Sequence, residues 1–436
     1  MRRRLIETRF LGLIALLCLG LVSKAEELGL DQQIDKVFGD LTGWFVDLIF
    51  YQIPFSENVS IYWVLFPLIL GAGYFTFYFN LINFRKIGVA VNIVRGKYDE
   101  LDHHESITAA GDSTPGGDNI ETIAIEGHEG EVSHFQALTA ALSATVGLGN
   151  IAGVAIAVSI GGAGATFWMI VAGFLGMASK FVECTLGVKY RDIDENGVVY
   201  GGPMYYLTKG LKARGFTKLG KILAVLFAIF VVGGSFGGGN MFQANQAFQL
   251  VQNITGGDTS MLAGNGWLFG LVMAVLVGIV IIGGIQKIAK VTDKIVPFMV
   301  VTYVAASIFV LVAKYDMIGW AFSEIINGAF SPEGVAGGAI GVLVQGFRRA
   351  AFSNEAGVGS ASIAHSAVKT KYAASEGLVA LLEPLIDTVI VCTMTALVLI
   401  ITGNVNADNA SLNDAQAILL TSGAFESVIS WFPYVL

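Results

Sequence analysis

Long apolar stretches, separated by polar connections, recur along the whole chain. About 20 apolar residues are enough for a helix to cross the hydrocarbon core of a bilayer. Such stretches cover 61–84, 135–160, 164–188, 220–251, 265–284, 295–313, 335–352 and 377–402. Because helices satisfy their backbone hydrogen bonds internally, so many apolar segments predict an all-α, polytopic membrane protein.

The N-terminus has the pattern of an export signal. Arginines at 2–4 precede an apolar run from Phe10 to Val22, which is short for a span, and small residues follow it. We interpret residues 1–25 as a cleavable signal peptide or, alternatively, as an uncleaved anchor. In either case the chain from about Glu26 begins outside the cytoplasm.

Residues 26–59 contain no long apolar run but carry an apolar face at helical spacing, which predicts a periplasmic helix lying in the membrane interface. The face consists of Val37, Leu41, Trp44, Phe45 and Leu48. Residues 60–97 then contain the first predicted span, followed by a basic, amphipathic segment on the cytoplasmic side. This span is additional to the two repeats that are described below.

An acidic loop is predicted over 98–133, on the cytoplasmic side. It contains His103, His104 and His128, and His134 follows directly. A metal site is conceivable, but neither an HExxH motif nor the spacing of a ligand pair occurs here. A solvated loop is therefore the favoured interpretation.

Composition supports a lipid environment and excludes several classes of protein. Of 436 residues, 54% are hydrophobic and only 14% are charged, whereas soluble domains carry roughly 25% charged residues. The net charge of −8 provides no basic surface for nucleic acid. We therefore expect the lipid bilayer, and no nucleic acid, as a partner.

The distribution of Lys and Arg predicts the orientation of the spans. If the chain starts outside and alternates, the outer segments hold only Lys24, Lys36 and Lys314. The inner segments hold Arg85, Lys86, Arg95, Lys97, Lys189, Arg191, Lys209, Lys212, Arg214, Lys218, Lys221, Lys287, Lys290, Lys294, Lys369 and Lys371. This excess satisfies the positive-inside rule and predicts a multi-pass protein of a bacterial inner (plasma) membrane with its N-terminus outside.

Glycine is unusually abundant, at 54 residues, and is concentrated within or beside the spans. Scattered glycines let membrane helices pack closely. Three clusters, at 145–153, 233–240 and 352–360, are denser. Glycine weakens a helix by up to about 1 kcal/mol per residue, and unwound backbone at membrane depth is typical of transporter binding sites. The first and third clusters therefore predict broken helices.

Polar residues beside these two clusters suit a cation and a zwitterion. Asn150 and Thr145 belong to the first cluster, and Asn354, Ser353 and Ser360 to the third. Freed carbonyls and neutral oxygens can hold Na⁺, and the N-terminus of a half-helix can hold a carboxylate. Arg348, Arg349 and Glu355 lie nearby, either as a gate or ion pair at membrane depth or at the cytoplasmic interface.

One enzyme-like motif occurs in the sequence, but not in the structural context that its chemistry requires. Residues 233–237 match the G-x-S-x-G nucleophile elbow, which requires a strand, a turn and a partner histidine. This segment lies in an apolar span, and no predicted span contains a histidine. We therefore do not expect an enzyme.

Several longer motifs point to one family. They are SHFQAL at 133–138, TVGLGNIAG at 145–153, GGPMYYL at 201–207, GNMFQ at 239–243 and FSNEAGVGS at 352–360, and LIDTVIVCT at 385–393 looks like the next span. Over about residues 61–435 the chain strongly resembles the alanine/glycine:cation symporters.

The resemblance implies a leucine-transporter-like fold with five-plus-five inverted repeats and one extra N-terminal span. Residues 134–313 would form the first repeat, and 335–436 part of the second. The chain ends at Leu436, about where the family has an aromatic-rich span and two more. The expectation is therefore an incomplete second repeat.

The resemblance also implies the function, which is symport of alanine or glycine with Na⁺ by alternating access and without any other cofactor. The implied substrate-binding residues are Thr145, Gly147, Gly149, Asn150, Asn240, Gln243, Phe352, Ser353 and Asn354; the implied sodium ligands are Thr145 and Asn150. Two alternatives stay open: a cation-coupled transporter of another small solute, and a truncated membrane protein that does not transport.

Overall fold

The computed structural model describes residues 30–56, 59–98, 130–237, 239–331, 338–404 and 417–436. The predicted signal peptide or anchor at 1–25 lies outside these ranges. So does most of the predicted acidic loop, including His103, His104 and His128.

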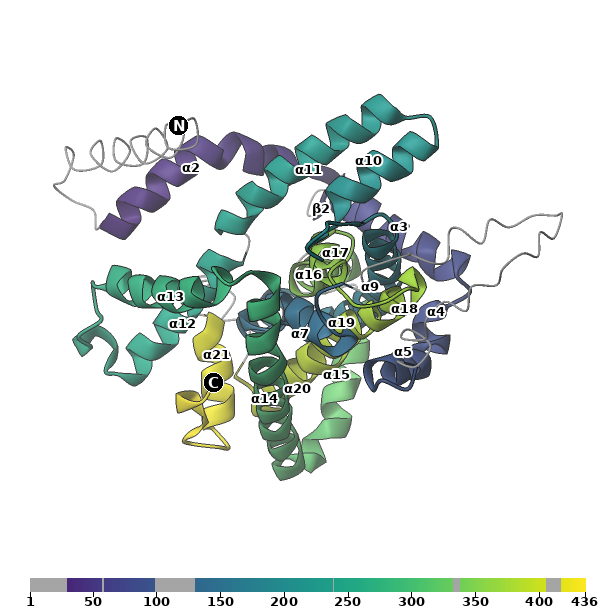
Figure 1. Cartoon of the computed structure of the whole chain (residues 1–436). Helices are drawn as coiled ribbons and strands as arrows, with labels where there is room; N and C mark the ends of the chain where they lie inside the picture. The colour runs from purple at the N-terminus through teal and green to yellow at the C-terminus, as the bar shows by residue number, and fades with distance from the viewer. Residues whose placement is uncertain (1–29, 57–58, 99–129, 238, 332–337, 405–416) are drawn as a thin grey trace.

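The described chain is mostly helical (Figure 1). The helices of the first half are α2 (Leu30–Ile49), α3 (Leu65–Tyr78), α4 (Ile82–Arg85), α5 (Ile87–Val94), α7 (His134–Thr145), α8 (Leu148–Gly161), α9 (Gly164–Lys189) and α10 (Pro203–Ala213). Those of the second half are α11 (Thr217–Gly237), α12 (Asn240–Ile254), α13 (Gly266–Ile281), α14 (Gly284–Ala313), α15 (Ile318–Phe330), α16 (Gly338–Asn354), α17 (Ser360–His365), α18 (Ala373–Ala380), α19 (Leu382–Pro384), the π-helix η4 (Leu385–Cys392), α20 (Thr393–Thr402) and α21 (Ala417–Glu426).

Two small antiparallel hairpins correct the all-α prediction to a mostly helical one. The first pairs β1 (Gln52–Ser56) with β2 (Val59–Tyr62), directly after the amphipathic helix α2. The second pairs β3 (Asp192–Ile193) with β4 (Val199–Tyr200), after α9. Both connect helices, so the helical architecture that holds the site is unchanged.

The membrane-spanning helices differ in number from the eight predicted apolar segments. Among the described residues, four helical stretches are long and apolar enough to cross a membrane, or five if the bent pair α7 and α8 counts as one. They cover Gly164–Lys189, Thr217–Ile254, Gly284–Ala313 and Ala373–Thr402.

The predicted span at 61–84 shows why the numbers differ. Its first residues belong to β2, and α3 has only 14 residues. Asn80 and Leu81 then adopt positive φ angles of 50° and 57°, a region that interrupts a right-handed helix. An apolar run alone does not reveal such interruptions. The shorter apolar helices also include α13 and α21.

Helix α9 lies at the centre of the fold and packs against α15, α16, α17 and α18. Glycines make these contacts close: a Cβ on Gly164 would lie 2.2 Å from the carbonyl carbon of Gly328 in α15. One on Gly346 of α16 would lie 2.6 Å from the Cβ of Trp168. Such approaches exclude any larger residue, as expected for packing between membrane helices.

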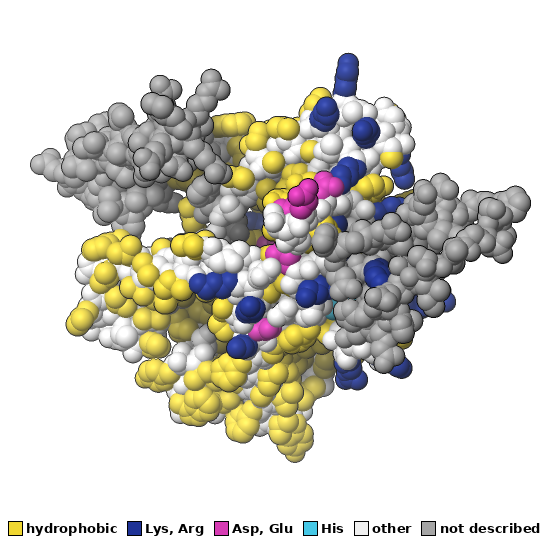
Figure 2. All heavy atoms as spheres, viewed as in Figure 1, with side chains coloured by type: hydrophobic (Ala, Val, Ile, Leu, Met, Phe, Trp, Pro, Cys, Tyr) yellow, Lys and Arg dark blue, Asp and Glu magenta, His cyan; other side chains and the backbone are white. Residues whose placement is uncertain are grey.

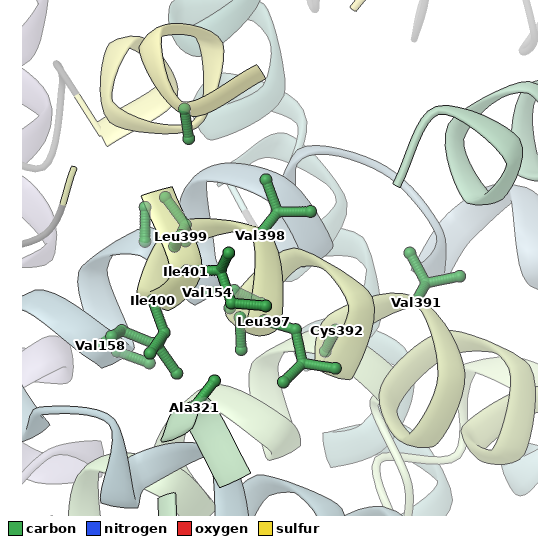
Figure 3. Packing of buried hydrophobic residues seen from close by; sticks show 14 of the residues in the cluster. Val154, Val158, Ala321, Val391, Cys392, Leu397, Val398, Leu399, Ile400 and Ile401 are labelled. Atoms are coloured by element: carbon green, nitrogen blue, oxygen red, sulfur yellow. The ribbon is translucent and has the colours of Figure 1, made fainter. Parts of the chain in front are cut away.

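A large apolar cluster holds α8 against α15, η4 and α20 (Figure 3). Val154 and Val158 contribute from α8, Ala321 from α15, and residues 397–401 from α20. This cluster fixes α8 and η4 relative to one another, and the candidate site lies where both begin.

The surface separates into charged and apolar regions. Figure 2 shows Lys and Arg side chains at the top, across the middle and on the right side of the molecule, and apolar side chains filling the bottom. On α14, Phe298 and Val301 are 72% and 67% exposed. An apolar surface of this extent fits contact with lipid.

Candidate functional site

The first predicted helix break is present in the structure. Helix α7 ends at Thr145, α8 begins at Leu148, and their axes differ by 42°. Val146 between them is extended, with φ −78° and ψ 108°. The C-terminal carbonyls of α7 and the N-terminal amides of α8 thus meet at one point, where the first attract cations and the second attract anions.

Asn150 closes this break and joins it to two other elements. Its Oδ1 accepts a hydrogen bond from the Gly147 amide, at 2.7 Å. Its Nδ2 lies 2.6 Å from Oδ1 of Asp387 in η4 and 3.1 Å from Oγ of Ser353 in α16. One side chain thereby links a broken helix to two segments more than 200 residues away.

Asp387 is the most informative residue of the site, although no role was predicted for it from the sequence. Its carboxylate is fully buried and accepts from Asn150 and, at 2.7 Å each, from the hydroxyls of Ser353 and Thr388. Within the described residues no salt bridge involves Asp387. The sequence nevertheless indicates a role for Asp387, because burying a carboxylate inside an apolar stretch costs free energy and is typical of functional residues in membrane proteins.

The second predicted break meets the same π-helix. Helix α16 ends at Asn354, and Glu355, Gly357 and Gly359 have positive φ angles of 52°, 87° and 93° before α17 begins. Nδ2 of Asn354 donates to the Thr388 hydroxyl over 2.9 Å. Both broken helices therefore bind to η4, and π-helical turns are frequent at functional sites.

Aromatic and amide side chains face the glycines of the first break. A Cβ on Gly147 would lie 3.1 Å from Oε1 of Gln243 in α12. One on Gly149 would lie 3.8 Å from the ring of Phe352, which itself packs edge-on against Phe242 with centroids 5.6 Å apart. Gly147 thus lies close to Gln243, and Gly149 lies close to Phe352.

Thr145 and Asn240 make different contacts. Thr145 is buried, its hydroxyl lies 3.5 Å from the Leu142 carbonyl, and it lines a cavity of about 70 Å³ together with Lys180 and Glu355. Asn240 is exposed, and its amide donates to the carbonyl of Ser235 at the end of α11. The structure therefore does not bring Asn240 into the cluster around Asn150.

A larger cavity of about 200 Å³ opens beside the first break. Val146 and Gly147 line it from the break, Tyr303 from α14 and Val391 from η4. Its walls are mainly apolar, and the Tyr303 hydroxyl is 2.7 Å from that of Thr395. Apolar walls with a few polar groups at one end are typical of small-molecule sites.

Two alternatives were open for Arg348, Arg349 and Glu355, namely a gate or ion pair at membrane depth and a position at the cytoplasmic interface. In the structure these residues lie in separate surroundings. The guanidinium of Arg348 lies 5.0 Å from the ring centroid of Tyr62. Glu355 accepts a hydrogen bond of 2.6 Å from Ser360. Arg349 is buried within α16.

A cluster of Cys184, His365 and Glu383 has the geometry of a possible metal site, since one ligand atom of each lies within 4.8 Å of the others. Both nitrogens of His365, however, lie at hydrogen-bond distance from carboxylates, those of Glu376 and Glu383. The ammonium of Lys180 is 2.8 Å from Glu383. The ligand atoms are thus engaged and a cation is already present, which disfavours a metal here.

Comparison with protein families agrees with this geometry. Residues 49–436 match the model of the sodium:alanine symporter family. The chain belongs to that family. The match includes both broken helices and η4, and it places the chain among multi-pass membrane transporters and not among enzymes.

Individual relatives support the family assignment. The sodium/alanine symporter AgcS of Methanococcus maripaludis is 44% identical over 274 residues, covering 63% of this chain and 58% of the relative. The probable sodium/glutamine symporter GlnT of Bacillus subtilis is 35% identical over 279 residues, covering 63% and 54%. The amino-acid carrier protein AlsT of the same organism is 36% identical over 247 residues, covering 56% and 50%. The aligned parts amount to about half the length of these relatives.

Proposed function

We propose that this family member binds a small neutral amino acid, alanine or glycine, together with Na⁺ at the break between α7 and α8, and that it works by alternating access. The observation that carries this proposal is the buried carboxylate of Asp387, held by neutral donors beside the break. Several kcal/mol are needed to bury a charge without compensation. A bound cation would supply that compensation.

The sodium site would draw on the oxygens that converge there. The side chains of Asp387 and Ser353 lie within hydrogen-bond distance of one another and of Asn150. Thr145 ends α7, where unpaired carbonyls carry partial negative charge. Oxygen ligands of this kind suit a hard cation. The proposed sodium ligands are therefore Thr145 and Asn150, which were predicted from the sequence, together with Ser353 and Asp387.

The amino acid would lie against the N-terminus of α8. Its carboxylate would meet the first amides of that helix, which favour an anion, and Na⁺ would neutralise it from the other side. The space between the backbone of Gly147 and Gly149 and the side chains of Gln243 and Phe352 is small. A small space favours a substrate with a small side chain. The name of GlnT, a probable sodium/glutamine symporter, makes glutamine the first competitor to examine.

The same proposal includes the repeat architecture and the orientation. Helices α7 with α8 and α16 with α17 would be the matching broken helices of two inverted repeats, over 134–313 and 335–436. Breaks at corresponding points of two halves are typical of transporter binding sites. The excess of Lys and Arg in the segments predicted to lie inside supports a cytoplasmic location for those segments.

Binding of labelled alanine to the purified chain in lipid nanodiscs tests this function. We expect binding in Na⁺ that is lost when choline replaces Na⁺, and competition by glycine. Absence of alanine binding in Na⁺, or equal binding in choline, would contradict the proposal. Stronger competition by glutamine than by glycine would reassign the substrate and keep the sodium site.

A further inference from the structure

Helices α10 and α11 form a hairpin that lies apart from the site described above. They are joined by a turn at 214–216, in which Gly215 has a positive φ of 85°. The two helices pack closely, since a Cβ on Gly220 would lie 2.6 Å from the carbonyl oxygen of Leu207. In Figure 1 this hairpin forms the top of the molecule, and Figure 2 shows Lys and Arg side chains there.

The hairpin carries five positive charges, and residues 203–237 contain no Asp or Glu. Two of the five have a local explanation. Lys209 forms an ion pair with Asp192, and Lys212 lies in the last turn of α10, where the helix dipole favours a positive charge. The other three, which we call the basic patch, are exposed and pair with no carboxylate among the described residues. They are Arg214, Lys218 and Lys221.

Two cations of the basic patch lie where the helix itself disfavours them. Lys218 is in the first turn of α11, and the partial positive charge at a helix N-terminus repels a cation. Lys221 follows three residues later, so the two side chains are neighbours on the helix surface and repel one another. A negatively charged partner would offset both repulsions.

Apolar side chains continue the face of α11 on which Lys218 lies. Ile222, Val225 and Ile229 follow it at helical spacing, and each is more than half exposed. They belong to the helical stretch Thr217–Ile254, which is long and apolar enough to cross a membrane. The basic patch therefore lies at the end of an apolar span, which is the level of the phospholipid headgroups.

We propose that the basic patch binds the headgroups of anionic phospholipids of the phosphatidylglycerol class. The guanidinium of Arg214 and the ammonium groups of Lys218 and Lys221 would donate to phosphate oxygens. The acyl chains would lie along Ile222 and Val225. Basic residues next to a membrane span attract anionic lipids in this way, and binding would tie the first turn of α11 to the membrane surface.

The apolar residues within the patch favour a lipid over a soluble anion. Phe216 and Leu219 are interleaved with the three cations and are 59% and 47% exposed. A soluble anion would contact the charges and leave these side chains in water, whereas a phospholipid accounts for both. The basic patch shares no residue with the proposed sodium and alanine site, so failure of alanine binding would not affect this proposal.

Hydrogen–deuterium exchange of the full chain in two kinds of nanodisc tests the proposal. One kind contains phosphatidylcholine alone, and the other contains phosphatidylcholine mixed with phosphatidylglycerol. We expect the peptide covering 214–223 to exchange at least about threefold more slowly with phosphatidylglycerol, because bound headgroups reduce fraying of α11. The difference should disappear in about 1 M NaCl, where the Debye length is about 3 Å. Equal exchange of this peptide in both nanodiscs would overturn the proposal.

Two variants separate a local site from general attraction of a charged lipid. The first neutralises the basic patch with Arg214→Gln, Lys218→Gln and Lys221→Gln, and exchange of the peptide should no longer respond to phosphatidylglycerol. The matched control removes the same charge from exposed positions around α5 with Arg85→Gln, Lys86→Gln and Lys97→Gln, and the response should remain. Loss of the response in both variants, or its persistence in the first, would overturn the proposal. Equal protection by inorganic phosphate in phosphatidylcholine nanodiscs would also overturn it, in favour of a soluble anion.

Discussion

Nδ2 of Asn150 lies 2.6 Å from Oδ1 of Asp387, although the two residues are 237 positions apart. The same nitrogen also lies near the Asp387 carbonyl, Ser353 Oγ and Cys392 Sγ. An amide NH₂ has only two hydrogens, so it can serve two of these four acceptors at a time. The donors around Asp387 are therefore all neutral, and a bound cation would compensate the charge of its carboxylate.

Gly149 sets the depth of the proposed substrate site. A leucine there would extend into the Phe352 ring and the Ser353 backbone, which lie 3.8 and 3.9 Å from the position of its Cβ. We expect Gly149→Leu to abolish sodium-dependent alanine binding, measured with labelled alanine. Gly149→Ala is the matched control, since its methyl group would make ordinary contacts and binding should be reduced by no more than a few fold. Undiminished binding in Gly149→Leu would contradict the assignment of the break as the site.

Gly164 tests the close packing of α9 on α15. A Cβ at this position would lie 2.2 Å from the carbonyl carbon of Gly328, so the two helices must separate. We expect Gly164→Ala to destabilise the protein by roughly 1–3 kcal/mol, as for overpacked cores, visible as a lower unfolding temperature in detergent. Gly153→Ala, in α8, has no atom within 4 Å of the new Cβ and should be neutral or stabilising. Equal stability of the two variants would argue against this packing.

Arg191 fastens the segment after α17. Its Nη1 donates to the carbonyls of Ser366 and Val368, both at 2.6 Å, and its Nη2 donates to that of Thr370 at 3.0 Å. Burial lowers the pKa of the guanidinium to about 10, which leaves it charged at neutral pH. Lysine has no planar fork to reach three carbonyls.

We therefore expect Arg191→Lys to reduce the free energy of unfolding by about 1–3 kcal/mol, the cost of unpaired buried acceptors. Lys212→Ala, at an exposed position of α10, is the control and should leave the unfolding temperature unchanged. A thermal melt in which both variants match the unmodified protein would show that the three carbonyl contacts contribute nothing.

Both helix breaks were predictable from local sequence. Glycine at 147 and at 357 and 359 weakens a helix wherever the chain places it, and the structure has breaks at these points. Asn150, Ser353 and Asn354 could be named because they adjoin the breaks. The hairpin at 52–62 and the interruption at Asn80 and Leu81 were not predicted, because an apolar run has the same composition whether it is continuous or bent.

The role of Asp387 could not be derived in the same way. It follows from which helix packs beside the breaks, and that depends on contacts between distant segments, such as the apolar cluster of Figure 3. Contacts between buried ionisable side chains likewise join five helices; the residues are His134, Glu376, His365, Glu383, Lys180 and Glu183. Each of them is recognisable singly as a costly charge within or beside an apolar stretch, but their pairing is a property of the tertiary structure.

The central claim is that Asp387 compensates a bound cation, and binding of radioactive ²²Na⁺ to the purified chain tests it most directly. Asp387→Asn keeps the shape of the side chain, removes its charge and replaces one acceptor oxygen by an NH₂ donor, whereas Asp316→Asn makes the same change at an exposed position after α14. We predict that Asp387→Asn weakens Na⁺ binding at least tenfold while Asp316→Asn binds as the unmodified protein does. Equal ²²Na⁺ binding by all three proteins would contradict the account.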